Sequence, residues 1–110
     1  MKKSTITFTV HLDEKNIPEK ILWRATDGPT EKETETKSIN IALWDHQQKN
    51  TLRIDLWTKD MPIHEMKRFY IDCMGGMAQT LLKSTGDEFF SKEIQGLCDK
   101  LVDHLKKNGE

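Results

Sequence analysis

Apolar and polar residues alternate along the first half of the chain, which is the pattern of half-buried β-strands. This alternation predicts four strands, over residues 4–12, 20–26, 37–45 and 51–59. Apolar residues then recur at steps of three and four, which predicts two amphipathic helices, over residues 62–84 and 87–107. The expected fold class is α+β: a four-stranded antiparallel sheet of two hairpins followed by two C-terminal α-helices packed on one face (β-β-β-β-α-α). At this length we expect a single domain, residues 1–110.

The pairing of the strands follows from the need to place all large apolar residues on one face. In the second hairpin, one register does this and sets Leu43 opposite Leu52. In the first hairpin, the register that does so sets Leu12 opposite Ile21. A slip by one residue would expose every apolar side chain, so the pattern specifies both registers strongly.

Two segments depart from these periods. Residues 27–37 contain no apolar side chain and begin with a glycine–proline turn, so we expect a mobile acidic loop that serves as a solvated connector. Gly75 and Gly76 lie inside the first expected helix, where each glycine costs up to about 1 kcal/mol relative to alanine. Close approach to another helix or to the sheet is the favoured explanation, ahead of a kink and of a functional hinge.

The helix ends carry capping signals. Asp60 can cap the first helix, and Pro62 stands in the first turn, where a missing N–H is harmless. Between the helices, residues 85–88 fit either of two arrangements. One is a capping box, and the other is a Gly86 terminator followed by an Asp87 cap.

Composition narrows the class of protein. Hydrophobic residues make up 35% of the 110 residues and charged residues 32%, which suits one core. No apolar run reaches the roughly 18–20 residues that a membrane-spanning helix needs, and the N-terminus lacks the apolar region of a secretory signal. Cys73 and Cys98 both fall in expected helices, where buried, reduced thiols are the favoured interpretation. We therefore expect a cytoplasmic protein with no membrane span.

The residue types that carry catalysis or bind metals are not grouped in the sequence. The four histidines fall on separate elements, and none has metal-ligand spacing with another histidine or a cysteine. No nucleophile motif is present, and the paired glycines do not follow a strand as a phosphate loop would. We expect no catalytic, cofactor-binding or metal-binding residues, no cofactor and no enzymatic activity.

The outer face of the expected sheet is the best candidate for function. The registers point two tryptophans, a leucine and two arginines away from the helices, namely Leu22, Arg24, Trp44, Arg53 and Trp57. Such residues would suit a protein partner or self-association, although a loop or a neighbouring subunit could equally cover each of them. Trp44 and Trp57 would lie about 20 Å apart at roughly 3.3 Å per residue, so they form no single patch. The net charge of −1 argues against nucleic acid.

Two blocks of sequence, residues 4–28 and residues 52–69, resemble the gliding motility-associated protein C (GldC) family. The second block contains the join Trp-Thr-Lys-Asp-Met-Pro between a strand and a helix. The resemblance implies a small cytoplasmic accessory protein of the motility apparatus, not an enzyme, whose protein partners include other gliding-motility components. It transfers no site residues.

The order of elements also resembles the SecB-type export chaperones. This similarity is one of topology alone, and topology does not fix function. It implies an alternative, an oligomeric protein that holds unfolded clients, and it leaves self-association open.

Overall fold

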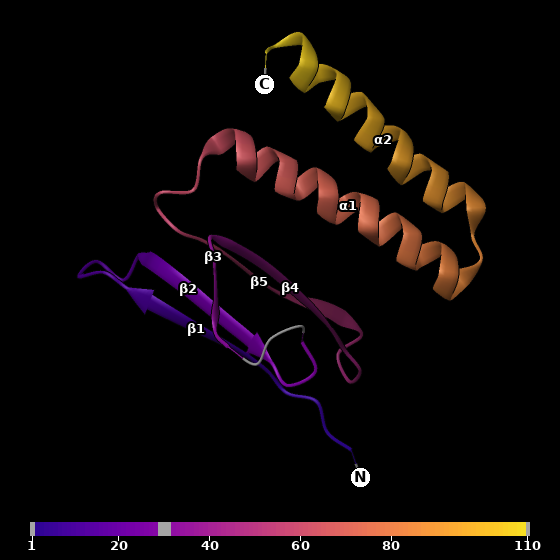
Figure 1. Ribbon diagram of the computed structural model, residues 1–110. Coiled ribbons are helices and arrows are strands. Elements are labelled where there is room, and N and C mark those ends of the chain that lie inside the picture. Colours follow the sequence, from indigo (N-terminus) through magenta and orange to yellow (C-terminus); the bar gives the residue numbers. More distant parts are fainter. Residues whose placement is uncertain (1, 29–31, 110) are drawn as a thin grey trace. The chain divides into compact units, whose positions relative to one another are not determined.

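The computed structural model describes residues 2–28 and 32–109. The chain divides into two compact units, a strand unit up to Met61 and a helical unit from Pro62 (Figure 1). Antiparallel strands followed by two C-terminal helices confirm the α+β class. Each unit is described by itself, and the packing of the helices on a sheet face stays a prediction.

The strand unit contains one strand more than the sequence pattern predicts. Its strands are β1 (Ile6–Leu12), β2 (Pro18–Ala25), β3 (Thr34–Thr36), β4 (Ser38–Asp45) and β5 (Asn50–Trp57). The extra strand β3 falls inside the loop expected over residues 27–37, where β-branched threonines suit a strand next to β2. Residues 29–31 of that loop lie outside the described residues, and its mobility stays a prediction.

The strands form two sheets, so the expected single four-stranded sheet is wrong. One sheet has the order β1-β2-β3, and the other pairs β4 with β5. If the pairing of Ile21 with Thr36 continued along β2, the start of β4 would lie opposite Pro18. That position is taken, because the Lys59 N–H at the end of β5 donates to the Pro18 carbonyl at 3.2 Å. The chain therefore leaves β2 at Lys37 and pairs with β5 instead.

The first hairpin has a register two residues away from the expected one. Ile21 lies opposite Val10, not opposite Leu12. The cause is the short turn after β1, where the Asp13 carboxylate accepts the N–H groups of Lys15 and Ile17 at 2.8 and 2.9 Å. This turn closes the hairpin earlier than the chain length alone suggests, and an irregularity between His11 and Leu12 moves the pairing one residue further, so that Leu12 lies opposite Pro18. From Ile6 to His11 the shift is even, so the predicted apolar face is kept there.

The second hairpin confirms the expected register. Leu43 lies opposite Leu52, and the pairing is regular from Ser38–Trp57 to Asp45–Asn50. The Asp45 carboxylate closes the turn by accepting the N–H groups of Gln47 and Gln48. Alternation therefore sets the pairing here without interference from the turn.

The helical unit consists of α1 (Ile63–Thr85) and α2 (Glu88–Lys107). Gly86 ends α1 in the left-handed conformation, at φ 75°, and its N–H donates to the Leu82 carbonyl at 2.8 Å. Asp87 caps α2 by accepting the Phe90 N–H at 2.9 Å. Of the two arrangements considered, the glycine terminator followed by the Asp87 cap is correct.

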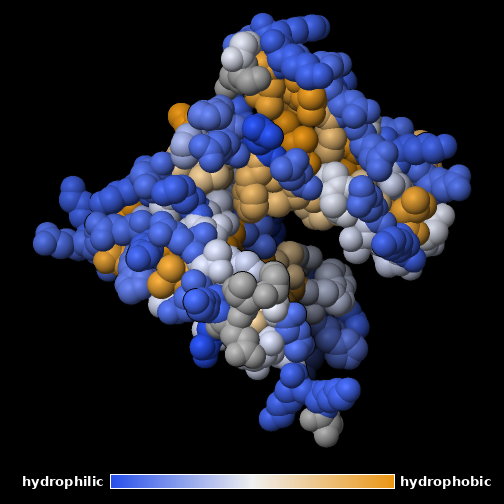
Figure 2. All heavy atoms as spheres, viewed as in Figure 1, coloured by the Kyte–Doolittle hydropathy of each residue, from blue (hydrophilic) through white to orange (hydrophobic). Residues whose placement is uncertain are grey.

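Small buried groups join the two helices. The Ser91 hydroxyl donates to the Ala78 carbonyl at 3.0 Å, and the Cys98 thiol donates to the Ile71 carbonyl at 3.7 Å. Figure 2 shows apolar side chains gathered between α1 and α2. A Cβ added at the Gly75–Gly76 pair would meet no atom within 4 Å, so close approach of α2 does not explain these glycines.

Candidate interaction surface

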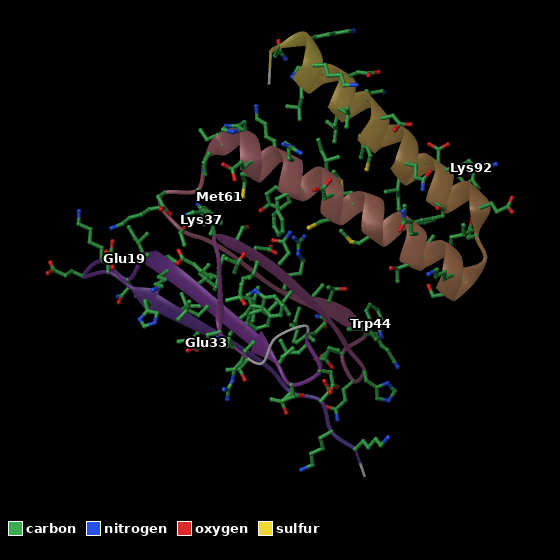
Figure 3. The ribbon with its side chains drawn as sticks, viewed as in Figure 1. Glu19, Glu33, Lys37, Trp44, Met61 and Lys92 are labelled. Atoms are coloured by element: carbon green, nitrogen blue, oxygen red, sulfur yellow. The ribbon has the colours of Figure 1, made fainter. Side chains whose placement is uncertain are left out.

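One face of the β4–β5 hairpin exposes two tryptophans. Trp44 is 64% exposed and Trp57 is 53% exposed. Trp44 lies opposite Thr51 at the turn end, whereas Trp57 lies opposite Ser38 at the other end. At roughly 3.3 Å per residue they are about 20 Å apart along the strands. Figure 3 labels Trp44 at the far end of β4 from Lys37.

A polar cluster lies between the two tryptophans on the same face. Arg53 and Asp55 form an ion pair at 2.8 Å along β5. Asn40, with its amide nitrogen turned toward β5, donates to the Asp55 carboxylate at 3.1 Å. Exposed pairs of this kind contribute at most about 1 kcal/mol, so their main effect is to keep this face polar between its two aromatic ends.

The other two predicted interaction residues lie on the first sheet. Leu22 is half-buried in β2, between Thr9 of β1 and Glu35 of β3, and Arg24 is exposed two residues further along β2. The structure therefore divides the five predicted residues between two sheets and does not bring them into one patch. Their role in binding stays a prediction.

The end of β5 holds a cluster that the sequence analysis missed. Thr58 is only 1% exposed, and its hydroxyl donates to the Asp60 carboxylate at 2.7 Å. Lys37 binds the other oxygen of that carboxylate at 2.8 Å, and its carbonyl accepts the Thr58 N–H at 2.8 Å. Asp60 is thus engaged within the strand unit, and α1 has Pro62 at its N-cap with no side-chain cap, so the predicted Asp60 cap is wrong.

Lys59 joins the end of β5 to the first hairpin. Its ammonium group lies 3.1 Å from the Asp13 carboxylate and 3.2 Å from the Glu19 carboxylate. Its N–H donates to the Pro18 carbonyl. The Thr-Lys-Asp run that resembled the family block therefore fixes the strand unit. In the sequence, this cluster is indicated by a threonine followed directly by a lysine and an aspartate, just after a strand.

The charges of this cluster shift the pKa values of its members. The Lys37 ammonium, together with the Thr58 hydroxyl, holds the pKa of Asp60 below its ordinary value of 3.8. The Ile17 N–H, helped by Lys59, lowers the pKa of Asp13 from the same value. Asp13 and then Glu19 raise the pKa of Lys59 above 10.5. All three shifts favour the charged forms, as expected when opposite charges adjoin.

A shallow hollow of about 280 Å³ adjoins Trp57. It is lined by residues of the first turn, of β2 and of the end of β5, namely Ile17, Pro18, Asp55, Leu56, Trp57 and Lys59. Its lining is mainly apolar and includes one acidic and one basic residue, Asp55 and Lys59. Such a site can accept a small apolar or mixed side chain of a partner.

Within residues 2–28 and 32–109, no three histidine, cysteine or acidic side chains form a group that could hold a metal ion. Neither of the described helices combines the length and the apolarity needed to cross a lipid bilayer.

These features define a small α+β protein with exposed aromatic side chains on a hairpin. A protein-family model described as "Gliding motility-associated protein GldC-like" matches residues 18–107. The chain belongs to this GldC-like family, as the resemblance predicted, and membership associates it with gliding motility. The match begins at Pro18, so most of the first resembling block lies outside it. Searches of curated proteins and of solved structures returned no match.

Proposed function

We propose that the protein is a non-enzymatic, cytoplasmic accessory protein of bacterial gliding motility that binds protein partners through the outer face of β4 and β5. The exposure of Trp44 and Trp57 carries this proposal. Tryptophan and arginine are the residue types most enriched among the side chains that dominate binding energy, and Arg53 lies between the two. The partners would be other gliding-motility components, as family membership suggests.

The spacing of the tryptophans is compatible with one interface. A standard interface buries about 800 Å² on each partner, which corresponds to a patch roughly 28 Å across. Two anchors about 20 Å apart fit inside such a patch. A polar centre with Arg53 and Asp55 would then supply directional contacts between the two aromatic anchors.

The proposal is tested in a gliding bacterium from which the endogenous protein has been deleted. The double variant Trp44→Lys with Trp57→Lys should fold but fail to restore colony spreading. A photo-crosslinker at position 44 or 57 should label the same protein band. Lys92→Ala, on α2, is the matched control and should restore spreading fully. Normal spreading with the double variant, at wild-type abundance, would contradict the proposal.

A client-holding oligomer is the second candidate function. Its support is the pair of leucines Leu43 and Leu52, both more than half exposed on the other face of the same hairpin. Exposed apolar pairs of this kind can bind unfolded chains. This candidate predicts that the full chain suppresses the aggregation of thermally unfolded citrate synthase, and that Leu43→Ser with Leu52→Ser abolishes the effect. An unchanged aggregation rate would eliminate it.

A further inference from the structure

One edge of β5 is open. β5 pairs with β4 along its other edge, and no strand of the described residues pairs with the open one. The Thr58 N–H points to Lys37 on the β4 side, whereas the Lys59 N–H points the opposite way, to Pro18. Because strand N–H groups alternate in direction, the main-chain groups of Arg53 and Asp55 face the open edge. Such an edge is a template for another strand.

Space is available beside this edge. The hollow next to Trp57 is lined by Asp55 and Trp57 from one face of β5 and by Leu56 from the other. Since side chains of both faces contribute, the hollow lies at the edge of the strand. Ile17 and Pro18 of the first hairpin also line this hollow, and the Pro18 carbonyl accepts the Lys59 N–H, so the stretch of edge offered to a second strand ends before Trp57.

The sequence of β5 is complementary to itself. Arg53 and Asp55 flank Ile54 symmetrically on one face of the strand. If a second copy pairs antiparallel about Ile54, each Arg53 lies opposite Asp55 of the other copy. Both residues have their main-chain groups on the open edge, so each such pair also exchanges two backbone hydrogen bonds. On the opposite face, Leu52 then lies opposite Leu56 of the second copy.

Neighbouring registers are unfavourable. The next allowed shift in one direction sets Arg53 opposite Arg53, and in the other direction it sets Asp55 opposite Asp55. Like charges directly opposite each other destabilise a strand pair, whereas opposite charges stabilise it. Only the register about Ile54 makes both cross-strand pairs attractive.

The other long edge strands lack this feature. The outer face of β1 carries only Thr7, Thr9 and His11 between the ends of the strand, so no pair of opposite charges selects a register. In β4 the single charged residue is Asp45, at the turn. Of these three strands, β5 alone has opposite charges arranged symmetrically about one residue.

We propose that the protein forms a twofold dimer by antiparallel pairing of β5 with β5 of a second copy, centred on Ile54. The two hairpins then make one four-stranded sheet in the order β4-β5-β5-β4. The contact is isologous, as in most homodimers, because the same residues meet from both sides. It uses the main-chain edge of β5, and it shares Arg53 and Asp55 with the face assigned to other partners.

Charge reversal tests the pairing. The full chain should show a mass of twice 12.8 kDa by light scattering. Arg53→Asp alone or Asp55→Arg alone places like charges opposite each other twice, and each should weaken the dimer at least about tenfold. The matched control Lys20→Asp, at an exposed basic position of β2, should leave the dimer intact.

Mixing the two single variants separates pairing between copies from pairing within a strand. An Arg53→Asp chain carries two acids, and an Asp55→Arg chain carries two bases, so neither has an ion pair within its own β5. Across the proposed contact, both pairs of the mixed dimer are attractive. The mixture should therefore regain the dimer mass while each variant alone stays monomeric. A monomeric wild-type chain, or a mixture that stays monomeric, would overturn the proposal.

A disulfide reports the register itself. Ile54→Cys places two thiols opposite each other, at a Cα separation of about 4.5 Å for a non-hydrogen-bonded pair, which a disulfide can span. Leu52→Cys is the control, because its two copies would lie four residues apart. Oxidation should cross-link the first variant and not the second. Equal cross-linking of both would contradict a contact centred on Ile54, and loss of gliding with an intact dimer would count only against the proposed function.

Discussion

The two hairpins of the strand unit have the same alternating sequence pattern but very different surroundings. Ile21 of β2 is 0% exposed, whereas Ile54 of β5 is 50% exposed. β2 has a strand on each side, and β5 has one only. The pattern thus indicates which face is apolar, and the number of neighbouring elements decides how deeply that face is buried.

The hairpins also differ in how they are fixed. The turn of the first hairpin is closed by Asp13 and is held to the end of β5 by Lys59. In the second hairpin, the ion pair between Arg53 and Asp55 stays within one strand. The first hairpin therefore acts as the anchor of the unit, and the second presents side chains and an edge to its surroundings.

Truncation of a core isoleucine should show the largest contrast between the hairpins. Ile21→Ala removes fully buried atoms and should lower the free energy of unfolding by about 2–5 kcal/mol. Ile54→Ala should cost less than about 1 kcal/mol in dilute monomer, because half of its side chain already contacts solvent. Urea unfolding followed by tryptophan fluorescence measures both, since all three tryptophans lie in the strand unit.

Ile21→Val is the graded control for this comparison, and about 0.5–1.5 kcal/mol is expected for it. Equal costs for the two alanine variants would show that the hairpins share one depth of burial. The first hairpin would then not be the more deeply buried part of the strand unit.

A middle-sized effect is expected at the junction between the hairpins. Thr58→Val keeps the shape of a buried side chain but removes the hydroxyl that donates to Asp60, and should cost about 1–3 kcal/mol. Thr51→Val, the same change at an exposed position of β5, should stay within about 0.5 kcal/mol. If the two variants unfold at the same urea concentration, the junction does not anchor the unit.

The smallest effect should come from pH. The pKa of Asp60 is lowered from 3.8, so the stability it contributes is complete above that value and is lost as the pH falls toward the lowered pKa. Asp60→Asn should therefore be less stable than wild type at neutral pH, and the two should converge as the pH falls through the lowered pKa of Asp60. Lys37→Met removes the lysine ammonium, which is the first cause of the lowered Asp60 pKa, and should show the same pH dependence as Asp60→Asn. The midpoint of urea unfolding, measured from neutral to acid pH, tests this prediction. A difference in midpoint between variant and wild type that stays constant with pH would contradict it.

Alternation and periodicity predicted the class and most of the elements. They fixed the register of β4 with β5 because the Asp45 turn leaves that pairing undisturbed. The same reasoning placed Trp44 and Trp57 on one face of the hairpin, since in this hairpin the face depends only on register.

Side-chain hydrogen bonds with the backbone account for what the pattern missed. Asp13 shortens the first turn by accepting two N–H groups, an effect that changes register without changing periodicity. Asp60 has the composition of a helix cap, but Lys37 and Thr58, from other parts of the unit, bind it first. Competition among partners distant in sequence is not visible in a local pattern.

The short connection between β3 and β4 restricts how the length of the chain can vary. Only Lys37 separates the two strands, and its carbonyl accepts the Thr58 N–H at 2.8 Å. One inserted residue there would break the alternation that runs from β3 into β4. Either β3 in its pairing with β2, or β4 in its pairing with β5, would then turn its side chains to the opposite face. Insertions in the turn at residues 46–49 would disturb neither pairing. Over evolutionary time, the hairpin can thus change length at its tip but not at its base.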